Sequence, residues 1–120
     1  MADRVLFISW REPVRGMEER AIEVFNEALG IMGRMQQDGR IERFDVQLLR
    51  PSADIGGYMS IFGTAEQIHA LREDEEFMRN TIDATLSVER MRHLEGFANE
   101  GVATQMGMYQ EAMGRMQARA

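Results

Sequence analysis

The pattern of apolar and polar residues predicts a short strand followed by a helix at the start of the chain. Residues 4–10 (Arg-Val-Leu-Phe-Ile-Ser-Trp) are apolar and rich in β-branched and aromatic side chains, which is typical of a strand buried on both faces. From Met17 onward, apolar residues recur every three or four positions, and Asp38-Gly39 provides a stop signal. We therefore expect a strand at 4–10 and a helix at 17–38.

The next segment changes to a period of two. Residues 41–50 alternate between polar and apolar side chains, which predicts a strand with one apolar and one polar face. Residues 51–57 contain Pro51 and a Gly-Gly pair and read as a loop, and residues 58–63 read as a third strand.

A second helical pattern runs from Thr64 to Leu86. Thr64 and Gln67 have the spacing of a capping box, which marks the start of a helix. Asp74 lies in a polar stretch in the middle and is itself a good helix cap. The pattern fits one long helix or two shorter helices that meet at Asp74.

The last part of the chain predicts a strand at 88–97 and a helix that Asn99 can cap. The apolar residues of this helix follow steps of four, three, four and three, which form a narrow seam suited to packing against another helix or a sheet. The seam consists of Val102, Met106, Tyr109, Met113 and Met116. We expect a domain at 1–98 and an amphipathic helix at 99–120 that packs on the domain or on a partner subunit.

The element order is β-α-β-β-α-β plus a C-terminal helix, which predicts a ferredoxin-like α+β fold with an antiparallel four-stranded sheet. Residues 5–97 resemble the dimeric α+β barrel proteins, which include antibiotic-biosynthesis-type monooxygenases and YCII-related domains. The resemblance lies in the element order, in Gln-Asp-Gly-Arg-Ile at 37–41 and in Leu-Arg-Glu-Asp-Glu-Glu-Phe at 71–77. It implies that two sheets pair face to face around a cavity. The Asn-His-Trp set of haem-degrading members and the His and Asp pattern of YCII-related domains are not found, so no catalytic residue is carried over.

Composition narrows the possible functions. The net charge is −6 and all fourteen basic residues are arginine, which argues against nucleic-acid partners and excludes lysine-based covalent catalysis. The chain has no cysteine, and therefore no disulfide, thiolate nucleophile or cysteine zinc site. No apolar run is long enough for a membrane span. We expect a cytoplasmic protein without membrane or nucleic-acid partners.

The polar face of the second strand supplies candidate ligand-binding residues. If its apolar residues meet the helices, Arg43, Asp45 and Gln47 turn to the open face of the sheet, which is the interior of a barrel-type dimer. With Tyr58 and His93 they form the predicted ligand-binding set. Alternatively, this face is solvated, or Arg43 forms an ion pair with Asp45.

His93 is the best acid–base candidate. On the predicted fourth strand it shares a face with Glu95, and a slip of one residue would exchange the two faces. If His93 lies near Asp45, the carboxylate could orient the imidazole as a general base. A structural role for His93 is the alternative. The spacing of His69 and His93 does not predict a metal site.

The sequence supports two hypotheses of different classes. The first is a non-catalytic binding or interaction module, a homodimer or higher homo-oligomer whose product is either the assembly itself or a small apolar molecule held in its barrel. The second is a cofactor-independent enzyme of the dimeric α+β barrel kind, monooxygenase-like or isomerase-like. In both, Trp10 is a candidate for the wall of a pocket mouth, or else a rim or core residue. The orientation of His93 and the size of the cavity distinguish the two hypotheses. A pocket of about 300 Å³ or more with convergent polar groups favours the enzyme, whereas a barrel interior filled by Phe7, Met59 and Phe62 favours the interaction module.

Overall fold

The structure, a computed structural model, describes residues 2–52 and 54–119. The elements in chain order are β1 (Arg4–Trp10), α1 (Glu18–Gln37), β2 (Arg43–Leu48), β3 (Gly57–Gly63), α2 (Ala65–Glu73), α3 (Glu75–Ser87), β4 (Arg92–Phe97) and α4 (Glu100–Arg119). Within these described residues the four strands form one antiparallel sheet in the order β2-β3-β1-β4. This is the ferredoxin-like α+β arrangement that the element order predicts.

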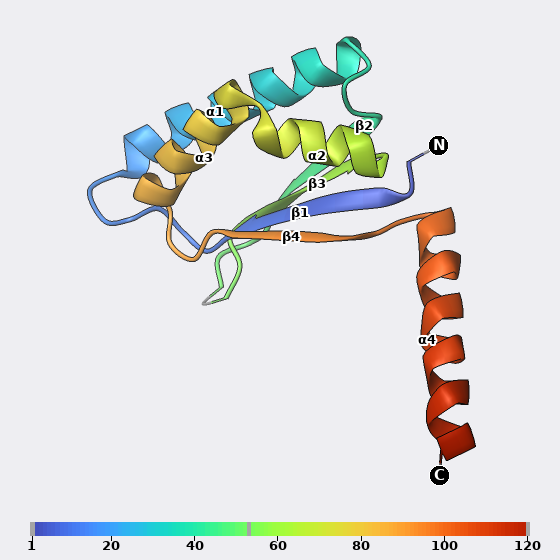
Figure 1. Cartoon of the computed structure of the whole chain (residues 1–120). Helices are drawn as coiled ribbons and strands as arrows, with labels where there is room; N and C mark the ends of the chain where they lie inside the picture. The colour runs from blue at the N-terminus through green and yellow to red at the C-terminus, as the bar shows by residue number, and fades with distance from the viewer. Residues whose placement is uncertain (1, 53, 120) are drawn as a thin grey trace.

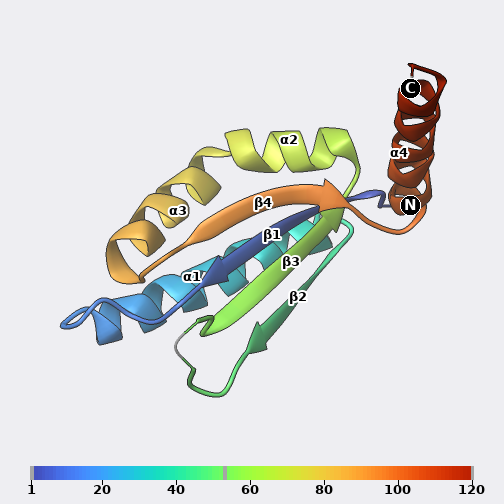
Figure 2. The same cartoon turned by 90° about the horizontal axis from the view of Figure 1, so that it is seen from below.

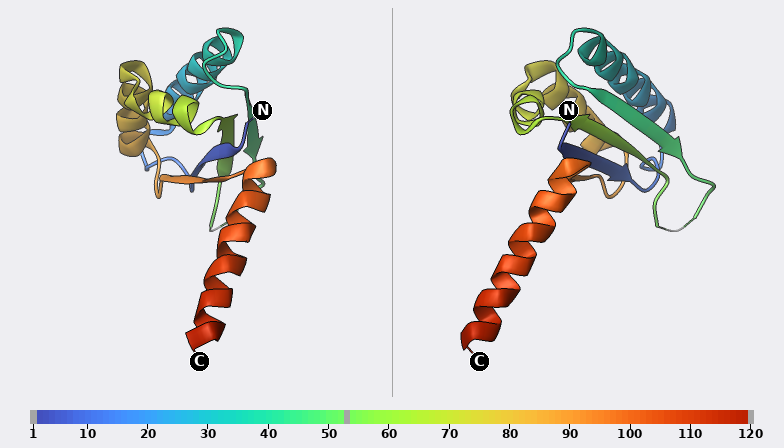
Figure 3. Two further views of the ribbon diagram at one scale, coloured as in Figure 1. Left: turned by 45° about the vertical axis from the view of Figure 1, so that its right-hand side comes forward. Right: turned by 90° about the vertical axis from the view of Figure 1, so that its right-hand side faces the viewer.

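The sheet is covered on one face only. Helices α1, α2 and α3 lie on that face, and α4 leaves the end of β4 and projects on the opposite side (Figures 1 and 3). Figure 2 shows the uncovered face, with α1 behind the β1–β3 side and with α2 and α3 beside β4. The chain has extents of 57 × 36 × 23 Å because α4 extends away from the sheet.

The hydrophobic core fills the space between the sheet and α1–α3. Alternate residues of the central strands point into it, including Leu6 and Ile8 of β1 and Met59 and Ile61 of β3. Burying these side chains is the main source of stability for such a layer. The intervening residues face the uncovered side, where Phe7 is half-buried. In the single chain β1 is therefore covered on one face, not on both as its apolar sequence predicts.

Local capping signals act as predicted in the second helical segment. The Gln67 amide donates to the Thr64 hydroxyl (3.1 Å), and the Thr64 amide donates to the Gln67 side chain (2.8 Å). At Asp74 the chain divides into α2 and α3, because the Asp74 carboxylate accepts from the Phe77 amide at 2.9 Å and starts a new helix. This hydrogen bond, assisted by Arg40, lowers the pKa of Asp74.

Two strands are shorter than their sequence patterns predict. β4 begins at Arg92 instead of Val88, and β2 covers residues 43–48 instead of 41–50. Residues 87–89 instead pair with the loop after β1: the Val14 amide donates to the Ser87 carbonyl and the Glu89 amide to the Glu12 carbonyl. Arg90 then has a φ of 53°, which interrupts an extended strand.

The base of α4 is attached closely to the N-terminal segment. Asn99 does not use its side chain as the expected acceptor cap; its amide group donates to the Ala2 carbonyl at 2.7 Å. Gly101 lies so close to Asp3 that an added Cβ would be 2.2 Å from the Asp3 carbonyl oxygen. Among the described residues of α4, only Gly101 is buried. The direction of α4 is therefore set by its first turn, while the rest of the helix is exposed.

Candidate binding site

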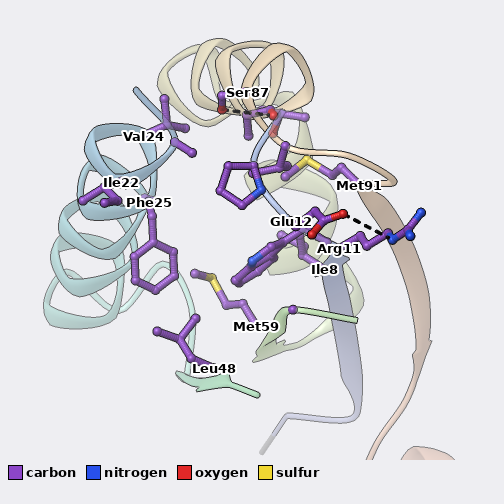
Figure 4. A pocket seen from close by; sticks show the side chains of 18 of the residues that line it. Ile8, Arg11, Glu12, Ile22, Val24, Phe25, Leu48, Met59, Ser87 and Met91 are labelled. Carbon is purple, nitrogen blue, oxygen red and sulfur yellow. Dashed lines mark hydrogen bonds and ion pairs between the residues drawn. The ribbon is translucent and has the colours of Figure 1, made fainter. Parts of the chain in front are cut away.

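A cavity of about 460 Å³ lies between α1, α3 and the covered face of the sheet (Figure 4). Its wall is mainly apolar, and it is formed by residues of α1, β1, β3, α3 and the segment before β4. Among the lining residues are Ile8, Val24, Phe25, Met32, Met59 and Met91. The volume lies in the range of small-molecule sites, which combine apolar walls with a few polar groups.

Trp10 and Phe25 form an aromatic part of the cavity wall. Trp10 ends β1 and Phe25 lies on α1, and their rings meet edge to face with centroids 5.8 Å apart. Trp10 can lie here because Gly57 leaves room for the indole ring, which an added Cβ would approach to 2.7 Å. Trp10 lines this cavity and also packs against the hydrophobic core, so its position combines the two alternatives that the sequence leaves open.

The Gly-Gly pair also shapes the end of the cavity. The Gly56 amide donates to the Trp10 carbonyl at 2.8 Å, and an added Cβ at Gly56 would be 1.9 Å from the Arg11 carbonyl oxygen. The loop before β3 can thus approach the end of β1 only because residue 56 lacks a side chain.

Two exposed apolar side chains, one from α1 and one from β2, lie at the edge of the cavity. Ile22 and Leu48 line it and are 62% and 67% exposed, respectively. Figure 4 shows Ile22 on the α1 side and Leu48 on the β2 side of the cavity. These two residues form an exposed part of its edge.

A few polar groups interrupt the apolar wall. The Asn80 amide donates to the Val24 carbonyl at 3.1 Å, and the Ser87 hydroxyl donates to the Ala84 carbonyl at 3.2 Å. Arg11 lies within ion-pair distance of Glu12 (3.8 Å) and Glu89 (4.0 Å). Its Nε is nevertheless a buried donor without a hydrogen-bond partner among the described residues.

His93 lines the cavity from β4. Its ring lies 6.0 Å from that of Phe77, between centroids. Burial, followed by the nearby Arg72 guanidinium, lowers the pKa of His93. The imidazole is therefore neutral at pH 7 and can donate or accept a hydrogen bond.

The structure does not bring His93 and Asp45 together, which corrects the arrangement considered for a catalytic pair. In the sheet register, His93 of β4 lies opposite Ile8 of β1. Asp45 of β2 lies opposite Ser60 of β3, and Ser60 lies opposite Phe7 of β1. Consecutive residues of β1 point to opposite faces. His93 thus faces the helices and Asp45 faces the uncovered side, with the sheet between them.

The other predicted ligand-binding residues lie together on the uncovered face and contact one another. Arg43 pairs with Asp45 at 2.5 Å and stacks over the Phe62 ring at 4.0 Å. Tyr58 is hydrogen-bonded to Gln47. The Arg43–Asp45 pair is about half exposed, so its contribution to stability is at most about 1 kcal/mol. A ligand-binding role for these four residues stays a prediction.

The apolar seam of α4 is largely exposed in the described chain. Its five residues, Val102, Met106, Tyr109, Met113 and Met116, are 49–73% exposed. Their interface role likewise stays a prediction.

Sequence reasoning missed the cavity and most of its lining residues. Phe25, Asn80 and Met91 belong to three segments that are far apart in sequence. Phe25 fits the apolar stripe of its helix, whereas Asn80 is a buried polar residue. No motif marks them as a group, because they come together only in the folded chain.

Two further classes of site have no counterpart in residues 2–52 and 54–119. No three His, Cys, Asp or Glu side chains there gather as a metal site. None of the helices in residues 2–52 and 54–119 has the length and apolar character needed to cross a membrane.

Comparison with known proteins supports the fold. No protein-family model and no curated protein sequence matches this chain. Several solved structures are similar, among them the following three. A dimeric ferredoxin-like protein of unknown function from Bacteroides fragilis has a TM-score of 0.59 and 12% identity over 79% of this chain and 96% of its own. A Bacteroides thetaiotaomicron protein of unknown function, described as a possible oxidoreductase, has a TM-score of 0.61 and 13% identity over 82% and 100%. A Pseudomonas aeruginosa protein has a TM-score of 0.61 and 11% identity over 82% and 96%. The chain is therefore a small ferredoxin-like α+β protein.

Proposed function

We propose that this protein is a homodimeric binding protein that holds a small apolar molecule in the cavity between α1, α3 and the sheet. The observation that carries the proposal is the cavity itself, about 460 Å³ with a mainly apolar wall. Its polar groups, above all the neutral His93 and the Arg11 Nε, which has no hydrogen-bond partner among the described residues, favour a ligand that carries one or two hydrogen-bonding atoms on an apolar, ring-sized body.

The homodimer is supported by the uncovered face of the sheet. Phe7 and Tyr58 form a tilted ring pair there at 5.3 Å, and Leu94 is 54% exposed on the same side of β4, since it pairs with Phe7. A second copy would cover these side chains and make the barrel-like arrangement that the sequence resemblance implies. The similar B. fragilis protein is described as dimeric.

Binding can be tested with the fluorescent probe 1-aminoanthracene. Trp10 is the only tryptophan of the chain and lies in the cavity wall, so we expect energy transfer from Trp10 to the bound probe. Saturable binding, with about one probe per chain, is the expected result. Absence of saturable binding to the folded protein would contradict the proposal.

A cavity-filling variant locates the probe. Ala28 lines the cavity, so Ala28→Phe should weaken binding at least tenfold by occupying the space. Ala103→Phe places the same ring on the exposed face of α4 and serves as the matched control, with unchanged affinity. Equal affinity of both variants would place the probe elsewhere.

A cofactor-independent enzyme that uses the same cavity is the second candidate. It is favoured by His93, because a neutral imidazole beside an apolar cavity can take the proton of a hydroxylated aromatic ligand. The description of the similar B. thetaiotaomicron protein as a possible oxidoreductase agrees with this chemistry, as does the sequence resemblance to cofactor-independent monooxygenases.

Oxygen uptake with 1,4-dihydroxynaphthalene tests the enzyme candidate. We expect uptake above the uncatalysed rate, and its loss in His93→Gln with retained binding of 1-aminoanthracene. If the wild type does not accelerate uptake, or if His93→Gln retains the acceleration, this role of His93 is wrong and binding remains the proposed function.

A further inference from the structure

We infer that α4 is a dimerisation arm whose apolar seam packs on the outer side of α3 in a second copy of this chain. The inference builds on the proposed homodimer and identifies both surfaces of a contact that lies outside the paired sheets. One surface is the α4 seam defined above. The other surface, the α3 stripe, consists of Met78, Ile82 and Leu86 of the second copy.

The α3 stripe is an apolar surface without a function in the single chain. Its members are spaced by four residues, so they share one side of α3, and they are 41%, 60% and 66% exposed. The side that faces α1 is a different one: Asp83 pairs with Arg20 of α1, and Asn80 donates to Val24 of α1. The α3 stripe therefore lies on a side of α3 that does not face α1, and α3 itself lies on the β4 side of the domain (Figure 2).

The α4 seam cannot reach this stripe within the same chain. α3 and the base of α4 stand on opposite faces of the sheet and near opposite ends of β4 (Figures 1 and 2). The Gly101–Asp3 contact and the Asn99–Ala2 hydrogen bond fix the direction in which α4 leaves the domain. Both surfaces are exposed in one chain and are complementary in chemistry, so a second copy is the natural partner.

The length of α4 suits this contact. Twenty residues of helix span about 30 Å, and two sheets packed face to face lie about 10 Å apart. The arm is thus long enough to pass the partner's sheet and reach the helices behind it. Consider a twofold axis that lies between the two sheets and is perpendicular to the strands. The arm leaves its own chain at the end of β4, and this axis places it beside the start of the partner's β4. That is the end of β4 near which α3 lies. The flank at the start of β2 offers the exposed polar residues Gln37, Arg40 and Glu42 instead.

The exposed area also indicates a partner. The chain has an accessible surface of 8232 Å², whereas a compact monomer of its mass exposes about 6,600 Å². Its radius of gyration is 17.1 Å, against about 13.6 Å for a compact 120-residue domain. The surplus area exceeds the roughly 800 Å² that each chain contributes to a stable interface.

Cross-linking between chains tests the contact directly, because the natural sequence has no cysteine. Full-length Met113→Cys and Ile82→Cys proteins are mixed, allowed to exchange subunits and treated with a short bismaleimide linker. We expect a covalent dimer that contains one chain of each variant. The same result is expected when Met106→Cys replaces Met113→Cys, when Leu86→Cys replaces Ile82→Cys, and when both replacements are made. The control replaces Ile82→Cys with Ile22→Cys, a residue on α1 of nearly equal exposure (62% against 60%), and should give none.

Each other outcome has a definite meaning. Efficient cross-linking of Met113→Cys to itself would show that two α4 helices pair with each other and would overturn the α3 contact. A dimer in sedimentation that gives no α4–α3 product with any of the four cysteine combinations would overturn it as well, while leaving the proposed homodimer intact. A monomer at all concentrations would overturn both.

Substitution provides a second readout that does not depend on cysteine geometry. Ile82→Asp should raise the dimer dissociation constant at least tenfold, because it introduces a charge into the buried contact. Ile22→Asp, the matched control, should leave it unchanged. An equal effect of the two variants would contradict the assignment of the α3 stripe.

Discussion

His93 and Asp45 show why side-chain orientation on a strand is hard to predict from sequence. The alternation of β2 correctly placed Arg43, Asp45 and Gln47 on the uncovered face, because Phe44 and Val46 are apolar enough to mark the core side. β4 carries polar residues on both sides, including His93, Arg92 and Glu95. Its register depends on pairing with β1, which is a tertiary property.

The burial of His93 predicts a pH dependence of stability. The pKa of His93 in the folded chain is lowered from the value of about 6.5 in the unfolded chain. At pH values between these two pKa values, the unfolded chain therefore binds more protons than the folded chain. The free energy of unfolding must then decrease as the pH falls below about 6.5. His93→Gln should flatten this part of the profile, measured by urea unfolding between pH 7.5 and 5. His69→Gln, at an exposed position on α2, is the control; an equal flattening by both variants would contradict this assignment.

Gly56 predicts a steric effect at the end of the cavity. Gly56→Ala would place a methyl group 1.9 Å from the Arg11 carbonyl oxygen, and we expect it to reduce the free energy of unfolding by about 1–3 kcal/mol. Gly33→Ala, on α1 with no atom near the added Cβ, should instead increase it by up to about 1 kcal/mol. Urea unfolding distinguishes the two, and a neutral effect of Gly56→Ala would argue against the close approach.

Helices were easier to predict than strands in this chain. The start of α2 at Thr64 and the division at Asp74 depend on side chains that contact amides three residues away, and such local signals are visible in the sequence. The start of β4 depends on residues 87–89 pairing with the loop after β1. Since that partner is more than 70 residues away, the pattern alone extended the strand by four residues.

The Asp74 cap predicts a measurable contribution from one carboxylate. Asp74→Ala should reduce the free energy of unfolding by about 1 kcal/mol at pH 7, because it removes the acceptor of the Phe77 amide. The folded pKa of Asp74 is lowered, so the difference from wild type should persist at neutral pH and vanish as the pH falls through that pKa, below about 4. Glu73→Ala, at the adjacent exposed position, is the control. If Asp74→Ala lowered the free energy of unfolding by the same amount at every pH, the proposed role of the carboxylate charge would be wrong.

The exposure of α4 predicts that its helix content depends on assembly. An unpacked helix of this length with glycines at 107 and 114 is marginal in water. Helicity measured by circular dichroism should therefore fall on dilution, together with the dimer fraction in sedimentation. Met106→Asp combined with Met113→Asp should abolish this dependence and leave a monomer. An unchanged size and thermal stability of that variant would contradict a buried seam.

At the scale of the whole molecule, the protein combines a fold that the sequence predicts with a cavity that the sequence does not predict. Element order alone was sufficient for the ferredoxin-like topology, and the similar solved structures agree with it. The expected cavity was the interior of a barrel formed by two uncovered faces. The cavity in the structure lies on the other side of the sheet, between the sheet and the helices. Residues such as Trp10, Phe25 and Phe77 line it there, and their packing is not visible in the sequence pattern.

The most direct test of the proposed function is a crystal structure of the full-length protein with 1-aminoanthracene. We predict a twofold dimer with the probe between α1, α3 and the sheet, in contact with Trp10 and Phe25 and with a hydrogen-bonding atom near His93 or Arg11. A cavity closed by its own side chains, with the probe absent or bound only on the surface, would contradict the proposal that this protein binds small apolar molecules there.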